Sequence, residues 1–144
     1  MPTVSPVPVS RTLLIVDDQA SVRLSLEFML SGCGYRILSV GGGAEALARM
    51  EAEPADGALI DVHMPVMNGF ETCQRLQATA ARLNRPLRVW FMTGAGGLAV
   101  EKRGAELGAL AVLSKPFEVG ALVARLEAGF AAVVNPVPTS PVAS

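Results

Sequence analysis

The segment LLIVDD, residues Leu13 to Asp18, joins a four-residue apolar run to two consecutive carboxylates. An apolar run this short is typical of a β-strand that is buried on both faces, as in a parallel sheet. Residues 21–30 then carry apolar side chains at helical spacing, and Gly32 and Gly34 follow them. Glycine is common just past the end of a helix. The segment therefore predicts a strand followed by a helix.

The same alternation continues to the end of the chain. After the first strand and helix, four more strands are predicted at Tyr35–Val40, Ala58–Ile60, Leu87–Met92 and Ala111–Leu113, and helices near residues 44–50, 70–76, 98–107 and 118–134. Five β–α units in strict alternation predict an α/β fold in which helices cover both faces of a five-stranded parallel sheet, the doubly wound arrangement. In such folds, functional sites gather at the carboxyl ends of the strands.

Composition sets the domain limits and excludes several functions. The body, residues 11–134, has the size of one domain, and residues 1–10 and 135–144 are uncharged, proline-rich segments that we expect to be flexible tails. With 12 basic and 13 acidic residues the net charge is −1, and no basic run is present. This balance argues against direct binding of nucleic acid or of an anionic membrane.

Cellular location follows from what the chain does not carry. The first ten residues lack the basic start of a signal peptide, and no apolar run is long enough to span a membrane. The two cysteines, Cys33 and Cys73, have no metal-ligand spacing, so we expect reduced thiols packed in or near the core. A cytoplasmic protein is the resulting prediction.

Polar residues with complementary chemistry follow four of the predicted strands. Asp17 and Asp18 follow the first strand, Asp61 ends the third, Thr93 ends the fourth and Lys115 follows the fifth. Carboxylates brought together at one edge repel one another unless a hard cation such as Mg²⁺ binds between them. A carboxylate can also act as a nucleophile toward phosphorus, while a lysine and a hydroxyl bind phosphate oxygens. The five residues together predict a phosphoryl-transfer site.

Each residue also has a simpler interpretation. Asp17 and Asp18 could cap the following helix, and Asp61 could be a turn residue. Lys115 could be a solvated surface lysine, and Thr93 an ordinary strand-end threonine. All of these simpler interpretations would have to hold at the same time, which favours a single phosphoryl-transfer site that the five residues share.

Four segments of the chain resemble the receiver domain of two-component response regulators. They are residues 14–18 (LIVDD), 61–69 (DVHMPVMNG), 92–94 (MTG) and 113–117 (LSKPF), and Gly108-Ala109 fits as well. The segment that begins at Asp61 is highly specific for that family, and the order and spacing of all four agree. The resemblance covers nearly the whole body and implies a flavodoxin-like (βα)5 fold.

The resemblance also implies a role for each position. Asp61 would be the phosphoacceptor, Asp18 a direct ligand of Mg²⁺, and Asp17 a ligand either directly or through water. The backbone carbonyl of His63 would complete the protein's share of the metal ligands. Such a domain is a signalling protein rather than an enzyme, although it assists its own phosphorylation and dephosphorylation.

Around the phosphoryl group, Thr93 would be the switch hydroxyl and Lys115 would hold a phosphate oxygen, with a cis peptide bond between Lys115 and Pro116. The phosphodonor would be a histidine kinase or a phosphotransfer protein. A downstream protein partner, or a second copy in a homodimer, would bind the face built from the fourth helix, the fifth strand and the fifth helix.

The chain departs from the family pattern at one position that matters for switching. Receivers usually carry an aromatic residue three positions before the lysine, and here that position is Val112. Because the loop at residues 94–97 (GAGG) is rich in glycine, we predict a switch that works mainly by ordering this loop. His63, two residues after Asp61, either tunes the loss of the phosphoryl group or is an exposed histidine without a chemical role.

The sequence leaves three other functions to compare with this one. A receiver fold that only binds partners and is never phosphorylated is one alternative. A hydrolase resembling the haloacid dehalogenase family would need a second acid two residues after Asp61, where this chain has His63. The glycines at 41–43 lack the GxGxxG spacing of a nucleotide-binding loop, so we interpret them as a turn. The stretch after the last helix contains no second domain, so we expect either a stand-alone receiver or a part of a longer regulator.

Overall fold

A computed structural model describes residues 11–131, so the predicted tails at 1–10 and 135–144 lie outside the described part of the chain. Its strands are β1 (Thr12–Val16), β2 (Arg36–Val40), β3 (Gly57–Asp61), β4 (Arg88–Thr93) and β5 (Ala111–Ser114). Its helices are α1 (Ala20–Ser31), α2 (Gly43–Ala52), α3 (Gly69–Arg82), α4 (Leu98–Glu106) and α5 (Val119–Ala131). The predicted order of elements is confirmed, and only the extension of the last helix to residues 132–134 falls outside the described range.

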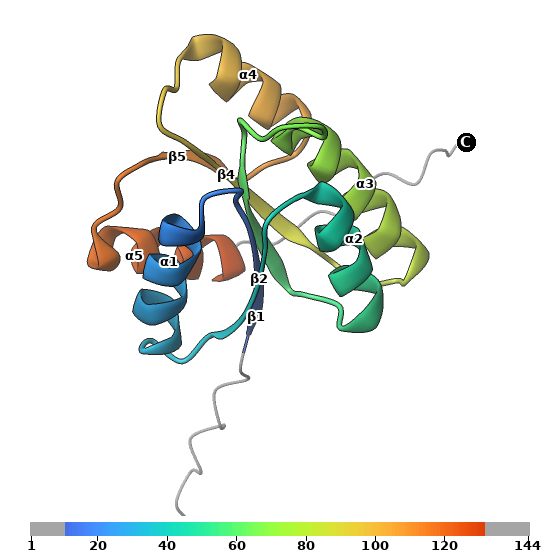
Figure 1. Cartoon of the computed structure of the whole chain (residues 1–144), viewed down its shortest axis with the longest axis horizontal. Coiled ribbons are helices and arrows are strands. Elements are labelled where there is room, and N and C mark those ends of the chain that lie inside the picture. Colours follow the sequence, from blue (N-terminus) through green and yellow to red (C-terminus); the bar gives the residue numbers. More distant parts are fainter. Residues whose placement is uncertain (1–10, 132–144) are drawn as a thin grey trace, which may run out of the picture.

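The strands form one parallel sheet in the order β2-β1-β3-β4-β5 (Figure 1). This is the flavodoxin-like order, in which the chain moves first to one side of β1 and then to the other. The doubly wound parallel sheet predicted from the sequence is therefore confirmed. The carboxyl ends of β1 and β3, which lie next to each other, mark the point where the direction of winding changes.

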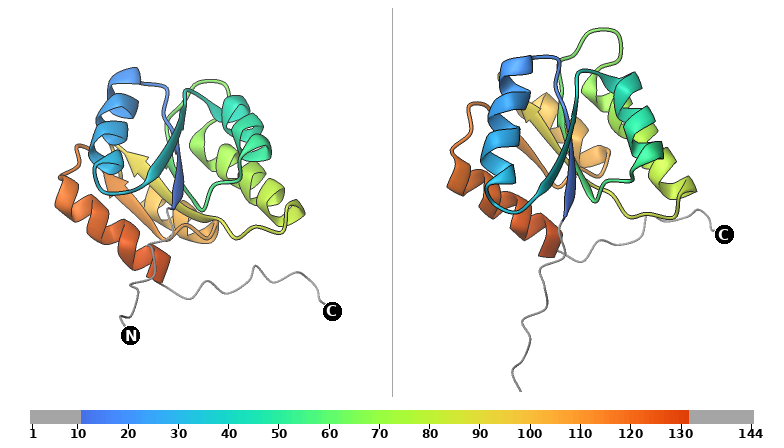
Figure 2. Two further views of the ribbon diagram at one scale, coloured as in Figure 1. Left: turned by 90° about the horizontal axis from the view of Figure 1, so that it is seen from below. Right: turned by 60° about the horizontal axis from the view of Figure 1, so that its bottom comes forward.

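Helices cover both faces of the sheet, with α1 and α5 on one face and α2, α3 and α4 on the other (Figures 1 and 2). Successive residues of β1 explain this, because side chains alternate between the two faces of a strand. Leu13 and Ile15 pack with α1 and α5, whereas Leu14 and Val16 pack with α2 and α3. A strand buried on both faces must be apolar throughout, which is why the apolar run LLIV predicted this strand.

The two cysteines differ from the sequence-based expectation. Both are free, but only Cys73 is buried, within α3, whereas Cys33 is exposed in the turn after α1. The prediction that both thiols pack in or near the core is therefore wrong for Cys33. Gly32 and Gly34 on either side of it place it in a solvent-facing turn, and the apolar character of cysteine does not outweigh that local geometry.

Among residues 11–131 there is no helix with the length and apolar character that crossing a membrane requires.

Candidate phosphoacceptor site

Three carboxylates meet where β1 and β3 end. Asp17 and Asp18 follow β1 directly, Asp61 is the last residue of β3, and Val16 of β1 pairs with Ile60 of β3. One carboxylate oxygen from each aspartate lies within 4.8 Å of the others. Asp17 is 0% exposed and Asp61 is 5% exposed, while Asp18 lies at the surface. The sequence-based expectation that these side chains share one edge of the sheet is confirmed.

Lys115 closes the site from the β5 side. Its Nζ lies 2.7 Å from Oδ2 of Asp17 and 3.5 Å from Oδ1 of Asp61. Its backbone amide donates to the carbonyl of Thr93 at 2.8 Å, which ties the end of β5 to the end of β4. The peptide bond between Lys115 and Pro116 is cis, as predicted. Lys115 is thus a half-buried partner of two acids and not a solvated surface lysine.

The capping interpretation of Asp17 and Asp18 does not hold either. The N-cap residue of α1 is Gln19, and its side chain makes no capping hydrogen bond. Oδ1 of Asp17 instead accepts the backbone N–H of Gln19 at 2.9 Å, which tightens the turn between β1 and α1. The second oxygen of Asp17 is left for Lys115.

The electrostatics of the cluster work against a charged Asp61. Burial and, next to it, the negative charge of Asp17 raise the pKa of Asp61 above the usual range of a carboxyl group. The positive charge of Lys115 and the backbone N–H of His63 act in the opposite direction. The site therefore holds more negative charge than its one lysine compensates, and a cation that enters it stabilises the ionised form of Asp61.

The donor set fits Mg²⁺. Carboxylate oxygens are the ligands that this hard cation prefers, and it commonly binds through one or two carboxylates while keeping several waters. Asp18 is exposed, and a carboxylate oxygen of the buried Asp61 lies within 4.8 Å of it, so one hydrated ion can contact both. Of the predicted metal ligands, the three aspartates lie together. The role of the His63 carbonyl stays a prediction.

The loop between β3 and α3 requires unusual backbone geometry close to Asp61. A Cβ atom at Gly69 would lie 2.2 Å from the backbone oxygen of Asp61, so only glycine fits there. Val66 has a φ of 70°, a left-handed conformation that β-branched residues rarely adopt, and its side chain is fully exposed. Asn68 then caps α3 by accepting the N–H of Glu71 at 2.9 Å. The segment carries the family pattern, and nothing in that pattern predicts the left-handed conformation of Val66.

Thr93 and the following loop form the side of the site that faces α4. The Thr93 side chain is buried, and its Oγ1 accepts the backbone N–H of Ala95 at 3.1 Å. Further along, α4 lies very close to β5, because a Cβ atom at Gly104 would be 2.9 Å from Cγ2 of Val112. Gly104, which has no side chain, thus allows α4 to pack closely on Val112.

The glycines at 41–43 do more than form the turn that the sequence predicts. A Cβ atom at Gly43 would lie 2.5 Å from Sδ of Met67 and 2.6 Å from Oγ1 of Thr72. Gly43 thus allows the start of α2 to pack directly on the β3–α3 loop beside Asp61.

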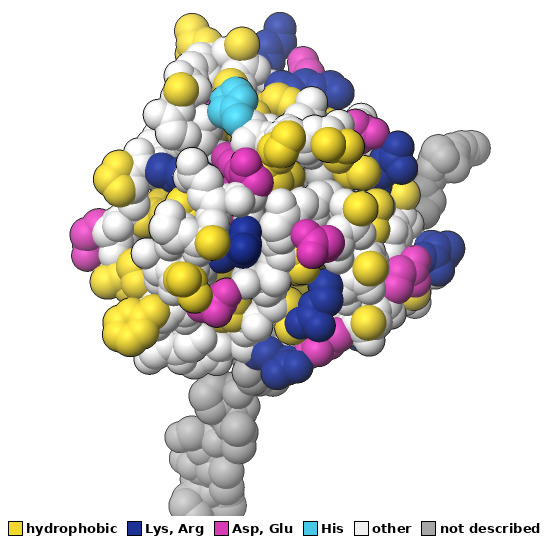
Figure 3. All heavy atoms as spheres, viewed as in Figure 1, with side chains coloured by type: hydrophobic (Ala, Val, Ile, Leu, Met, Phe, Trp, Pro, Cys, Tyr) yellow, Lys and Arg dark blue, Asp and Glu magenta, His cyan; other side chains and the backbone are white. Residues whose placement is uncertain are grey.

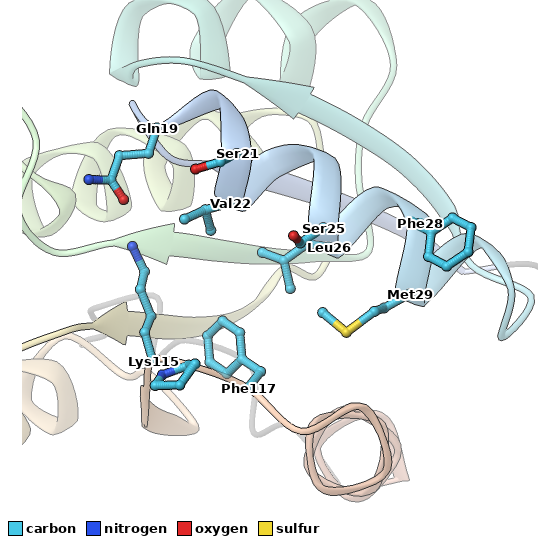
Figure 4. Close-up of a pocket in the computed structure, with 10 residues that line it drawn as sticks. Gln19, Ser21, Val22, Ser25, Leu26, Phe28, Met29, Lys115 and Phe117 are labelled. Carbon is cyan, nitrogen blue, oxygen red and sulfur yellow. The ribbon is translucent and has the colours of Figure 1, made fainter.

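A groove of about 630 Å³ opens next to Lys115, between α1 and the start of α5 (Figure 4). Val22, Leu26 and Met29 line it from α1, and Phe117 lines it from the other side. Gln19 stands at the end nearest Lys115 (Figure 4). The composition of the groove is mostly apolar, in contrast to the acidic cluster at its end.

His63, the only histidine, is exposed at the edge of the site (Figure 3). Its backbone faces Asp61 through the N–H described above, and its side chain is open to solvent. Both sequence-based interpretations of this histidine therefore stay open.

A parallel sheet with three acids, a hydroxyl and a lysine at its carboxyl edge defines a receiver-type signalling domain. The comparison with protein families agrees: residues 13–127 match the response regulator receiver domain, and the chain belongs to that family.

Individual relatives support the same assignment. The chain is 36% identical over 116 residues to a probable transcriptional regulator, ycf27, of Guillardia theta, which covers 81% of this chain and 44% of that protein. It is 35% identical over 116 residues to the response regulator MprA of Mycobacterium ulcerans, covering 81% of this chain and 48% of that protein. The chain thus spans about half the length of the curated relatives it matches.

Solved structures resemble the fold along most of the chain. The chemotaxis protein CheY4 of Vibrio cholerae is 28% identical, with a TM-score of 0.77 over 83% of this chain and 98% of that one. A putative response regulator from Chloroflexus aurantiacus is 33% identical, also with a TM-score of 0.77, over 85% of this chain and 99% of that one.

Proposed function

We propose that this chain accepts a phosphoryl group on Asp61 in a Mg²⁺-dependent reaction and thereby switches its binding to a partner protein. The observation that carries the proposal is the contact of Lys115 with both Asp17 and Asp61 at the mouth of the acidic cluster. A lysine in that position can bind an oxygen of a phosphoryl group on Asp61. Membership of the receiver family supports the same function.

In the proposed reaction an oxygen of the Asp61 carboxylate attacks phosphorus and the bond from phosphorus to the leaving group breaks. For a phosphohistidine donor, the leaving group is the imidazole nitrogen. Asp17, Asp18 and Asp61 would hold Mg²⁺, which supplies positive charge that neutralises the transferring group. Lys115 supplies the second positive charge, and Thr93 supplies a hydroxyl donor on the side of α4. Asp61 must be ionised to attack, and for that reason the charge of Lys115 matters before the phosphoryl group arrives.

The donor is a protein, a histidine kinase or a phosphotransfer protein, and the surface of α1 supports this choice. Only two charged residues lie on α1: Arg23 donates to the carbonyl of Asp17 at 2.7 Å, and Glu27 accepts from the hydroxyl of Ser39. Phe28 lines the apolar groove and is 85% exposed, and Leu24, one turn earlier on α1, is 65% exposed. Large exposed apolar side chains without competing charge are typical of a protein-docking surface. The groove ends at Lys115, so a helix docked there would reach Asp61.

The switch that we propose starts from the hydrogen bond between Thr93 and Ala95. If Oγ1 of Thr93 turns toward the phosphoryl group, it gives up the N–H of Ala95 at the start of the glycine-rich loop. The loop then takes a new conformation, and the start of α4 moves with it. The output partner, or a second copy of the chain, binds the face of α4, β5 and α5. A cytoplasmic location is part of the same proposal, since that is where the donor kinases present their phosphohistidine.

The proposal is tested by incubating the chain with acetyl phosphate, with and without Mg²⁺, and measuring intact mass. We expect one phosphoryl adduct that requires Mg²⁺ and is absent in Asp61→Asn. Asp56→Asn is the matched control, because Asp56 lies just before β3, at the opposite edge of the sheet. This variant should still be phosphorylated normally on Asp61. An adduct that persists in Asp61→Asn would contradict the assignment of the acceptor. A chain that binds Mg²⁺ but forms no adduct, even with a phosphorylated kinase, would be a receiver fold kept for binding alone.

A further inference from the structure

We propose that Arg23 is a positioning residue that fixes the turn carrying Asp17 and Asp18 and so sets the affinity of the site for Mg²⁺. Arg23 lies on α1 outside the acidic cluster and donates from Nη1 to the backbone carbonyl of Asp17 at 2.7 Å. The proposal rests on the proposed magnesium-dependent function and assigns a determinant of it.

Asp17 is held at four atoms, and Arg23 supplies one of these contacts. The backbone N–H of Asp17 donates to the carbonyl of Val40 at 3.2 Å, and the two carboxylate oxygens of Asp17 accept from Gln19 and Lys115. Its carbonyl oxygen accepts from Arg23. Because the carbonyl belongs to the peptide unit that joins Asp17 to Asp18, the contact fixes the plane from which Asp18 projects.

Asp18 depends on this support more than Asp17 does. It is exposed, and no hydrogen bond or ion pair of its carboxylate occurs within residues 11–131. The direction of its side chain is therefore set by its backbone. A ligand held only through its backbone loses its alignment when the neighbouring peptide is free to rotate, and that raises the entropy cost of binding a metal.

The surroundings of Arg23 suit this role. The Cβ position at Gly41, in the turn between β2 and α2, is only 3.4 Å from Nη1 of Arg23 and 3.3 Å from Oε1 of Glu45. The guanidinium thus lies between the β1–α1 turn and the β2–α2 turn. The absence of a side chain at Gly41 leaves the space in which it reaches the carbonyl of Asp17.

Charge and positioning predict opposite results for the loss of Arg23, which makes the proposal easy to test. A positive charge near a metal site repels Mg²⁺, so its removal alone would tighten metal binding. Loss of the contact to the Asp17 carbonyl would weaken the binding of Mg²⁺. The direction of the change in affinity therefore separates the two effects.

The experiment is calorimetric titration of the full chain with Mg²⁺. We expect Arg23→Met to raise the dissociation constant roughly tenfold, and Arg23→Lys, which keeps charge and a donor, to fall between Arg23→Met and the wild type. Arg125→Met, which removes an exposed arginine of α5, is the matched control and should leave the constant unchanged. If Arg23→Met fails to fold, Arg23→Gln, whose amide ends two atoms short of the guanidinium, replaces it.

Hydrogen exchange without metal gives an independent reading. In EDTA, Arg23→Met should speed exchange at the amides of Asp17 and Gln19, which donate to the carbonyl of Val40 and to Oδ1 of Asp17, while the rest of α1 is unchanged. Unchanged exchange together with equal or tighter Mg²⁺ binding would overturn the role of Arg23. Failure of the wild type to bind Mg²⁺ would instead overturn the proposed function, and the two failures are distinct.

Discussion

Replacing Asp61 by asparagine should make the metal-free protein more stable. Asp61 is 5% exposed, and its pKa is raised by burial first and by Asp17 second. A raised carboxyl pKa means that the charged form is disfavoured in the folded state relative to the unfolded chain. Asparagine has nearly the same shape and carries no charge, so the substitution removes the penalty while Lys115 keeps Asp17 as its partner.

The size of the effect follows from the distances. Nζ of Lys115 lies 3.5 Å from Oδ1 of Asp61, an attraction of about 4.7 kcal/mol at an effective dielectric constant of about 20. Ligand oxygens of Asp17 and Asp61 lie within 4.8 Å, which gives a repulsion of at least about 3.5 kcal/mol on the same scale. The two nearly cancel, so the cost of burying the carboxylate decides the sign. We expect a gain of about 1–2 kcal/mol, or roughly 3–8 °C in Tm for a domain of this size.

Denaturation in EDTA at neutral and acidic pH is the assay. Between the pKa of the unfolded chain and the higher pKa of the folded state, the native protein binds more protons. The stability of the wild type therefore falls as pH rises through that window. The advantage of Asp61→Asn should be present at neutral pH and shrink below the ordinary carboxyl pKa of about 3.9. Equal stability at neutral pH, or a gain that persists unchanged in acid, would refute the reasoning; Asp56→Asn should show no gain.

Three further predictions concern other parts of the fold. Gly104→Ala should lower the free energy of unfolding by about 1 kcal/mol, because its Cβ would lie 2.9 Å from Val112, and Val112→Ala in the same chain should restore most of it. A thiol reagent should label Cys33 at once and Cys73 only on unfolding, since burial raises the pKa of Cys73 to about 12; equal labelling rates would contradict this. For His63, a quench-and-mass assay of the dephosphorylation of Asp61 in His63→Ala decides between the two interpretations: a changed rate assigns the side chain a role in loss of the phosphoryl group, and an unchanged rate leaves it without one.

The fold and the meeting of the site residues could be predicted from the sequence because both follow from strand ends. In a parallel sheet all carboxyl ends lie at one edge, so polar residues that end buried strands must converge. Asp61 and Thr93 are such residues, and Asp17, Asp18 and Lys115 follow strand ends directly. No side-chain geometry was needed for that inference.

The interactions within the site could not be predicted in the same way, because they depend on rotamers and on distances across the sheet. Lys115 lies nearer to Asp17 than to the proposed acceptor, and nothing in residue spacing distinguishes these two partners. Nothing in the sequence indicates the contact of Arg23 with the carbonyl of Asp17, because an arginine in the first turns of a helix is usually solvated. The exposure of Cys33 does not follow from its residue type, because the glycines on either side of it place it in a solvent-facing turn.

The contact between Gly104 and Val112 limits how the proposed phosphorylation can be transmitted. A ring that rotates inward needs an aromatic residue on β5 and free volume beneath α4, and this chain has a valine there with α4 in contact. Thr93, by contrast, already holds the first residues of the glycine-rich loop through the N–H of Ala95, and its carbonyl holds the amide of Lys115. A movement of Thr93 toward Asp61 would therefore act on the loop directly. Since α4 begins directly after that loop, its first turn is the part of the output face that the switch reaches first.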